Sequence, residues 1–437
     1  MPTLCEIEHN SGISVLRRAA ARIASVSQIE PLSVNTRHAQ TLSGAAGART
    51  YQHLSASARL TICGATLCIV RAYIVWRGSF DASPCGGDTM NARLLCLLAL
   101  SLLSAPDVRA QQVKLTATLM VPISHPILGA SLVRFKEEVE KSSNNTVSIE
   151  IVDKAQLFGA TEVVGAVSSG AVEIGVAASY HFASRVPAVG FIDQPFLFNF
   201  SALVRAAATP GSEIRSMIDQ AILANLGVRV LWWQGLGNTV FFSKGKGVAD
   251  LEHMKGQRVG VNGKALGELV ARCGGRPIEL SFETLHDVMK GGGLDMTMGG
   301  ISAVQVFPLW EFTDTITRTQ HVPVEILLII NERTWQSLDD ARRTAIAGAA
   351  ARVELQTRER LPEMEAKIAA FASSKGFKIQ DLTPDQVVEW RACSAGLIAD
   401  YMDKNGEFAA KLMAAYGKLR TQPCCTTAPS SGGFTRR

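Results

Sequence analysis

The sequence predicts an α/β protein built from two lobes. Two runs of alternating strand and helix patterns carry this prediction, one over 113–178 and one over 257–298. Strands that alternate with helices along a chain favour a mostly parallel sheet. Residues 338–373 are rich in Ala with Arg and Glu interspersed, and their length and period predict one long helix. Two α/β units joined by connecting strands indicate a two-lobed clamp.

The elements follow from local periodicity, with strands where apolar residues alternate and helices where they recur about every 3.6 residues. The last helix has a start signal in Thr383 as N-cap and Pro384 in its first turn. The predicted strands are 113–121, 147–152, 172–178, 227–233, 257–262, 277–280, 294–298, 323–331 and 378–381, and the predicted helices are 127–140, 160–169, 201–225, 265–273, 283–290, 338–373 and 384–416.

These elements define the expected domain organisation. Lobe I comprises 111–233, with 322–375 returning to it. Lobe II comprises 234–321, with the C-terminal helices over 376–421. Residues 422–437 are rich in Ser, Gly and Pro near the chain end and are predicted to be a flexible tail.

Composition excludes several classes of protein. The chain has 437 residues, of which 47% are hydrophobic and 19% charged, with a formal net charge of +5. This hydrophobic content excludes an intrinsically disordered chain. Nine Cys residues in this length are too dilute for a small disulfide-stapled scaffold. The basic residues are too sparse to favour a nucleic-acid partner, so none is expected.

Residues 90–110 have the layout of a secretory signal peptide. Arg93 gives a short positive start, an apolar run follows over 94–103, and small residues precede position 111. The run is shorter than the roughly 20 apolar residues of a membrane-spanning helix. A buried core helix is the alternative interpretation. The signal predicts Sec-type export and a periplasmic mature chain that begins at 111.

Residues 1–89 differ in composition from the rest of the chain, since Lys114 is the first lysine of the sequence. We interpret 1–89 as an upstream extension without a fold of its own, with Met90 as the natural start. A transit or regulatory segment is the alternative. Ten of the 44 basic and six of the 39 acidic residues fall within 1–110, which leaves the mature chain with a net charge of +1. The basic balance therefore says nothing about partners.

Four Cys residues remain in the predicted mature chain. In an oxidising compartment, a bridge from Cys393 to Cys424 or Cys425 is one expectation, and free buried thiols are the other. Connectivity, including that of Cys273, does not follow from sequence.

Motifs for known catalytic chemistry are not found in the sequence. It contains no G-x-S-x-G, H-E-x-x-H, P-loop or C-x-x-C pattern, and its histidines after residue 110 do not share a metal-ligand spacing. We therefore expect no cofactor and no metal. An exported two-lobed α/β protein of this kind is predicted to bind a ligand and not to be an enzyme.

Several stretches, taken in order over about 113–415, resemble one family, the extracytoplasmic solute receptors of TRAP (tripartite ATP-independent periplasmic) transporters of the DctP type. The stretches are Ser124–Pro126, Gln156–Gly159, Ser169–Gly175, Asp193–Phe198, Val230–Trp233, Leu251–Gly256, and Phe282 with the helix that runs to Leu294 and Asp295.

The resemblance implies a two-lobed periplasmic-binding-protein fold with a long helix spanning both lobes. It implies a monomeric receptor that captures a small solute by lobe closure and delivers it to TRAP membrane permease subunits. Closure is expected to bend the strands near 231–240 and 320–326. An alternative is a ligand-binding sensory module that docks on a membrane sensor protein, and neighbouring genes would distinguish the two. An enzyme on the same fold is a third class.

The sequence departs from the family at three polar positions. The Arg that many members use for carboxylates aligns with Gly260, a second Arg aligns with Asn238, and a customary Asn aligns with Gly299. Three interpretations follow. The solute is not a simple carboxylate, or is larger and fills the space at these glycines; Arg258 or Lys264 supplies the charge instead; or the protein has lost uptake and binds another partner.

The candidate binding residues come from strand ends and from the positions of the family motifs. Trp233 is either a stacking surface or a core residue, Phe282 either contacts the solute or packs in the core, and Arg258 either contributes charge or is solvated. The full set is Ser124, His125, Tyr180, Trp233, Asn238, Arg258, Asn262 and Phe282.

Overall fold

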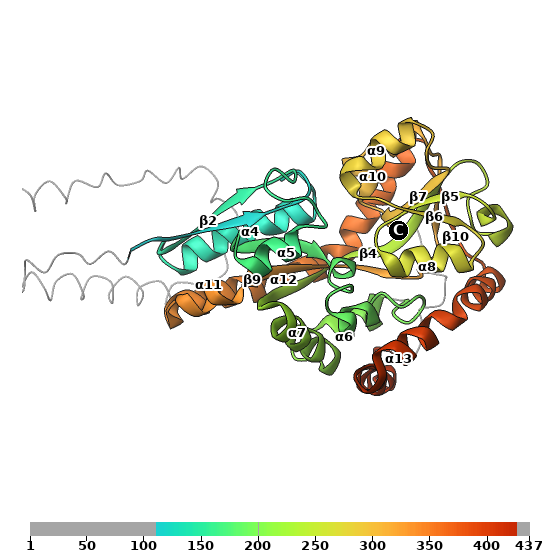
Figure 1. The fold of residues 1–437 in the computed structure, drawn as a ribbon. Helices are drawn as coiled ribbons and strands as arrows, with labels where there is room; N and C mark the ends of the chain where they lie inside the picture. Colours follow the sequence, from blue (N-terminus) through green and yellow to red (C-terminus); the bar gives the residue numbers. More distant parts are fainter. Residues whose placement is uncertain (1–110, 200, 426–437) are drawn as a thin grey trace, which may run out of the picture. The chain divides into compact units, whose positions relative to one another are not determined.

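The structure is a computed structural model, and it describes residues 111–199 and 201–425 (Figure 1). The predicted extension over 1–89, the signal peptide over 90–110 and residues 426–437 of the predicted tail lie outside the described residues. These parts of the sequence analysis stay predictions.

The described residues form ten strands in one sheet. Eight of them follow the order β2-β1-β3-β9-β4-β7-β5-β6, β8 pairs with β4, and β10 pairs with β8. β1 is parallel to β2 and β3, and β5 is parallel to β6 and β7. The predicted α/β class is confirmed. The strands are β1 Val113–Thr118, β2 Val147–Val152, β3 Ile174–Ala178, β4 Val228–Ser243, β5 Arg258–Val261, β6 Arg276–Glu279, β7 Met296–Gly300, β8 Thr315–Arg318, β9 Pro323–Asn331 and β10 Lys378–Asp381.

β4 is the strand that connects the two lobes. Its first part pairs with β9, and its second part pairs with β7 and β8. The sequence predicts a strand that stops at 233, whereas β4 continues for 16 residues to Ser243. The β4–β9 ladder shifts register twice, between Val230 and Trp232 and between Gly235 and Asn238.

Helices cover the sheet in both lobes (Figure 1). In lobe I, α4 Leu128–Ser142 packs on β2, α5 Val163–Ser169 on β3, α7 Glu213–Leu226 on β4, α6 Ser201–Ala208 on α7, and α11 Glu332–Ser337 on β9. In lobe II, α8 Lys264–Arg272 packs on β5 and β6, and the other helices are α9 Phe282–Lys290 and α10 Ala303–Val306.

Two long helices complete the chain. α12 (Asp340–Ser374) confirms the predicted long helix, begins at the Asp339 N-cap, and packs on α4, β4 and α10. α13 (Pro384–Arg420) begins with the predicted Thr383 cap, which forms a capping box with Gln386. It breaks at Gly406, whose φ of 51° and ψ of −129° are not helical.

The two halves of α13 pack on different parts of the molecule. Trp390 and Leu397 belong to a cluster with α8 and β5, whereas residues after the break, such as Leu412, pack with α6 and α7. The sequence, by contrast, predicts that the whole of 376–421 belongs with lobe II.

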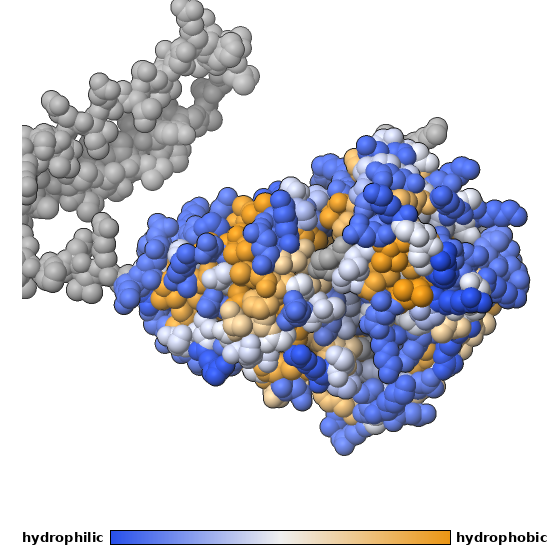
Figure 2. All heavy atoms as spheres, turned by 45° about the horizontal axis from the view of Figure 1, so that its top comes forward, coloured by the Kyte–Doolittle hydropathy of each residue, from blue (hydrophilic) through white to orange (hydrophobic). Residues whose placement is uncertain are grey.

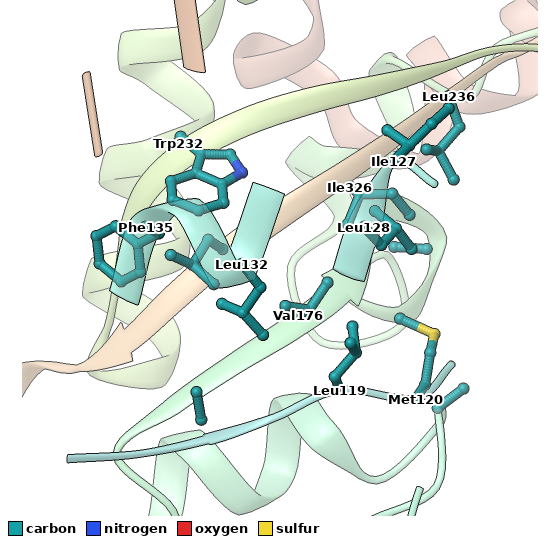
Figure 3. Packing of buried hydrophobic residues seen from close by; sticks show 14 of the residues in the cluster. Leu119, Met120, Ile127, Leu128, Leu132, Phe135, Val176, Trp232, Leu236 and Ile326 are labelled. Atoms are coloured by element: carbon teal, nitrogen blue, oxygen red, sulfur yellow. The ribbon is translucent and has the colours of Figure 1, made fainter. Parts of the chain in front are cut away.

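A large apolar core surrounds α4 (Figure 3). Phe135 meets Trp232 of β4 edge-on, with 5.0 Å between ring centroids. Leu236 of β4 and Ile326 of β9 lie near Ile127, at the start of α4. Each fully buried side chain of this size contributes roughly 1.5–3 kcal/mol through burial. The connecting strands are therefore anchored in the core of lobe I.

The disulfide differs from the expected one. Cys273, which caps α8, is bonded to Cys393 of α13, with 5.2 Å between their Cα atoms. The predicted bridge from Cys393 to Cys424 or Cys425 is wrong, because α13 places Cys393 beside α8 and carries the last two cysteines to α6. There Cys425 is buried near Ala202 and Cys424 is exposed, both as free thiols.

The surface shown in Figure 2 is mainly hydrophilic, with hydrophobic patches separated by hydrophilic side chains. Among the helices of 111–425, none is long and apolar enough to cross a membrane.

Candidate functional site

A cavity of about 760 Å³ opens between the two lobes. Three of its walls come from segments that follow β3, β5 and β6, and the fourth is the part of α13 over 397–405. Crevices at the carboxyl ends of sheet strands are the usual binding place in open α/β folds. The volume lies within the range of pockets for small organic molecules.

Two predicted binding residues line this cavity, Tyr180 and Asn262. Tyr180 follows β3 in a short 3-10 turn, and its ring packs edge-on against His181 at 4.5 Å between centroids. Asn262 follows β5 directly. Next to it, Gly263 has a φ of +89°, and a Cβ there would lie 3.1 Å from the Cβ of Tyr180. The lobes therefore approach each other beside both residues, and a glycine permits it.

Asp193 also lines the cavity, and it is only 2% exposed. Ser179 Oγ donates a hydrogen bond to its Oδ1 at 2.8 Å, whereas its Oδ2 has no partner among the described residues. Burial raises the pKa of Asp193 to about 7, because a carboxylate loses its hydration there. Asp193 is part of the stretch Asp193–Phe198 that resembles the family, but its place in the site is not predicted from the sequence.

The remaining charged residues of the cavity lie nearer to solvent. Lys264 approaches Glu268 at 3.9 Å, with the lysine side chain 83% exposed. Asp400 forms an ion pair with Arg272. Exposed pairs of this kind contribute little to stability, so these side chains are available for rearrangement around a bound molecule.

His125, Ser124 and Trp233 do not line the cavity. His125 is buried, and its Nδ1 accepts hydrogen bonds from the backbone N–H groups of Ile127 and Leu128 at 3.2 and 3.1 Å, so it caps α4. Burial lowers its pKa to about 4, which leaves the ring neutral and able to accept. Ser124 is exposed beside it. Trp233 is fully buried, and its indole N–H donates to Asp219 at 2.8 Å.

Asn238 and Arg258 lie in two other places. Asn238 stands on β4 opposite Pro323, and its Oδ1 accepts no hydrogen bond within the described part of the chain. Arg258 opens β5 at the end remote from Asn262 and is bonded to Asp295 at 2.7 and 3.1 Å. It faces a second cavity of about 690 Å³ in lobe II. The side chain of Phe282, which begins α9, lies outside the described residues.

Gly260 lies on β5 among closely packed side chains. A Cβ on this residue would lie 2.8 Å from Leu294 Cδ1, 3.0 Å from Thr297 Oγ1 and 3.2 Å from Leu280 Cδ2. Two leucine side chains and a threonine hydroxyl therefore lie close to this glycine, and the interpretation that a larger solute fills the space at Gly260 and Gly299 stays a prediction. No arginine fits there without displacing them.

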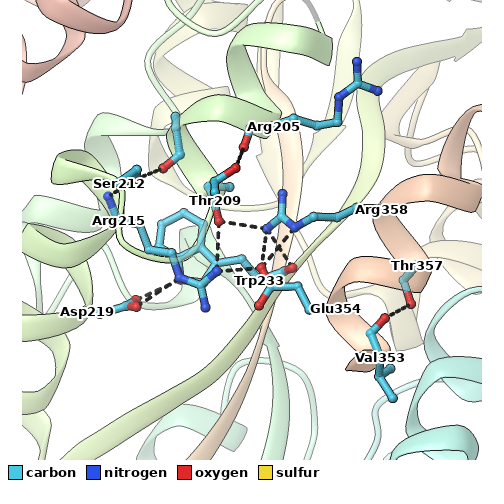
Figure 4. Close-up of polar contacts among 12 residues, drawn as sticks. Arg205, Thr209, Ser212, Arg215, Asp219, Trp233, Val353, Glu354, Thr357 and Arg358 are labelled. Atoms are coloured by element: carbon cyan, nitrogen blue, oxygen red, sulfur yellow. Dashed lines mark hydrogen bonds and ion pairs between the residues drawn. The ribbon is translucent and has the colours of Figure 1, made fainter. Parts of the chain in front are cut away.

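A buried charge network lies against β4 (Figure 4). Arg215 of α7 and Arg358 of α12 both bond to Glu354, and Arg358 also donates to the carbonyl of Trp233 at 2.9 Å. Asp219 completes the network by accepting from Arg215. Its members are far apart in sequence, and only the charged i,i+4 spacing within each helix hints at them.

The arrangement is suited to binding. In the part of the chain that the structure describes, no three His, Cys, Asp or Glu side chains are grouped to hold a metal ion. The cavity presents hydroxyl, amide, carboxyl and aromatic groups from both lobes, which can hold a small molecule that contacts both.

A profile of the DctP family, described as bacterial extracellular solute-binding protein, family 7, matches residues 119–405, which is more than half of the chain. The chain belongs to this family. DctP proteins are periplasmic solute receptors of TRAP systems and not enzymes. The two-lobed fold predicted from the sequence is confirmed.

The known proteins that resemble this chain are distant in sequence. The sialic acid-binding periplasmic protein SiaP of Vibrio cholerae is 21% identical over 254 residues, 57% of this chain and 77% of SiaP. An uncharacterized protein of Haemophilus influenzae is 22% identical over 221 residues, 50% of this chain and 66% of that protein. A Bordetella pertussis extracytoplasmic solute receptor that binds pyroglutamic acid has the same fold, with a TM-score of 0.66 at 20% identity, covering 70% of this chain and 99% of that one.

Proposed function

We propose that this DctP chain captures a small organic solute in the cavity between its lobes and, as a monomer, delivers it to a TRAP-type permease. The observation that carries the proposal is the cavity itself, whose walls come from both lobes and from α13. A solute that touches both lobes only when they close shifts the molecule to its closed state. Closure also excludes water, which strengthens each polar contact to the solute.

Tyr180 and Asn262 are the proposed solute contacts among the residues predicted from sequence. They stand on opposite lobes, at the point where Gly263 lets the lobes approach. A solute that contacts both residues would therefore bind the closed state of the two lobes. Ser124 is exposed outside the cavity and serves as a matched control.

Thermal unfolding of the purified protein with a panel of small organic solutes tests the proposal. A solute at 100 times its dissociation constant should add about 2.7 kcal/mol to the stability. Tyr180→Ala and Asn262→Ala should reduce that stabilisation, and Ser124→Ala should not. If no solute of the panel stabilises the protein, or if the control loses as much as the two site variants, the proposed site is wrong.

We propose further that residues 90–110 direct export and that the mature chain begins at 111. The Cys273–Cys393 disulfide supports this proposal, because such bonds persist in oxidising compartments and are rare in the cytosol. N-terminal sequencing of the protein from its native cells decides it. A mature chain that begins before residue 90 would refute the proposal.

A further inference from the structure

Asp193 is a buried acid without a full set of partners. Its Oδ1 accepts from Ser179, and its Oδ2 accepts from none of the described residues. An unpaired carboxylate removed from water is costly unless a hydrogen-bond donor or a cation reaches it. Asp193 lines the cavity between the lobes, so a bound molecule is a natural source of that donor.

Aromatic side chains share the cavity with Asp193. Tyr180 comes from the turn after β3, and Tyr401 comes from α13. Tyr401 is held in place by a hydrogen bond from its hydroxyl to the carbonyl of Pro187 at 3.2 Å. The faces of aromatic rings attract cations, and aromatic side chains are used to bind ammonium ligands.

The lysine side chains of the cavity are exposed to solvent, unlike the carboxyl group of Asp193. Lys264 and Lys404 are exposed at its edge, and Lys264 already approaches Glu268. The position of Gly260, deeper on β5, is covered by Leu280 and Leu294. The charge that the fold buries in this cavity is therefore acidic, and the basic groups stay in water.

We propose that the solute of this receptor carries a protonated amino group and that Asp193 binds that group through Oδ2. The inference rests on the proposed function and names the class of its solute. Because Asp193 is 2% exposed, the loop over 187–195 adjusts as the amino group reaches the carboxylate. Tyr180 and Tyr401 flank the same group.

Binding of an ammonium group has a proton signature. Burial raises the pKa of Asp193 to about 7, and a cationic partner restores ionisation. Binding should then release about 0.9 proton at pH 6 and about 0.1 proton at pH 8. Glu325 on β9 and Tyr401 on α13 are titratable groups whose charge interacts with Asp193, so the signal is assigned by substitution of Asp193 itself.

Three four-carbon probes distinguish the solute classes: 1,4-diaminobutane, 4-aminobutyrate and succinate. Thermal unfolding of the full chain measures stabilisation by each probe. Calorimetry in two buffers of different ionisation enthalpy measures the protons released. Asp193→Asn keeps the shape and the acceptor for Ser179 but removes the charge. Glu359→Gln removes an exposed carboxylate of α12 that does not line the cavity and is the matched control.

We expect the two amino-bearing probes to stabilise the protein. In Asp193→Asn their affinity should fall at least tenfold and the proton release should be lost, whereas Glu359→Gln should change the affinity less than threefold. Stabilisation by succinate alone overturns the inference and leaves the proposed function intact. So does binding of amines that Asp193→Asn does not weaken. If neither amine binds, the inference is overturned, whereas the proposed function fails only if the whole solute panel also fails.

Discussion

Glu325→Gln should stabilise the protein at neutral and alkaline pH, although it removes a negative charge that interacts with two arginines. Glu325 is 2% exposed on β9, opposite Gly235 of β4, and its Oε2 has no hydrogen-bond partner among the described residues. Burial raises its pKa to about 7, and the charges of Arg358 and Arg215 oppose this rise only in part. The loss of hydration therefore outweighs the attraction to the arginines.

The sign and size of the effect follow from the two protonation states. The folded protein keeps the Glu325 proton up to about pH 7, whereas the unfolded chain loses it near pH 4.5. Between these values the folded state binds more protons, so its stability falls as the pH rises. At 1.36 kcal/mol per pKa unit, the fall amounts to about 3 kcal/mol. Gln does not ionise, and the variant keeps this stability.

Thermal unfolding at pH 4.5 and pH 8 measures the difference. With an unfolding entropy of about 2 cal/mol/K per residue and roughly 300 folded residues, 3 kcal/mol corresponds to a rise in Tm of about 5 °C at pH 8. At pH 4.5 the variant and the parent should be nearly equal. A variant that is less stable than its parent at pH 8 would show that the arginines hold an ionised Glu325, and would refute the reasoning.

Glu332→Gln is the control with the opposite sign. Burial raises the pKa of Glu332, but hydrogen bonds from Arg229 and Gln336 lower it overall. Arg229 binds both carboxylate oxygens, at 2.7 and 2.8 Å. The same substitution should therefore destabilise the protein at pH 8, and the loss should shrink as the pH falls below 4.5.

Three further predictions test the fold. Cys273→Ser with Cys393→Ser opens a loop of 120 residues and should lower the free energy of unfolding by up to about 4–5 kcal/mol in urea titrations; an unchanged midpoint would contradict this. His125→Ala should lower the free energy of unfolding by about 1 kcal/mol because the α4 cap is lost, and His125→Asn should recover part of that loss in the same assay. Gly260→Arg should lower Tm through overpacking against Leu280 and confer no succinate stabilisation; a gain of succinate binding would contradict the packing.

Local signals were sufficient for most of the fold. Three elements could be predicted from neighbouring residues alone. They are α13 from its Thr383 cap, β9 from its apolar run, and α12 from a helical period sustained over its length. The continuation of β4 past Trp233 was missed because Gly235 and Gly237 resemble a strand end. β8 was not predicted because its four residues, three of them buried, are too short a run to show an alternating pattern.

The candidate site was less accessible from sequence. Tyr180 and Asn262 were predicted because each directly follows a strand, and such positions converge on one edge of a sheet. Asp193 lies 15 residues beyond β3, where nothing local distinguishes a buried acid from a solvated one. The partner of Cys393 depends on how α13 crosses α8, which is a tertiary fact. The burial of Asp193 and the disulfide partner of Cys393 both depend on contacts between segments that are far apart in the sequence.

The connections between the lobes suggest how closure is confined to a few residues. The β4–β9 ladder is already irregular between Val230 and Trp232 on the lobe I side, but there Trp232 is buried in the core and Arg358 donates to the carbonyl of Trp233, so this part is held rigid. Immediately beyond, their ladder shifts register between Gly235 and Asn238, and a Cβ on Gly237 would clash with Glu365 of α12. A rigid segment next to an irregular one localises bending at the irregular one. Because Glu325 lies opposite Gly235, its buried, unpaired oxygen stands at the bend, where closure can change its hydration.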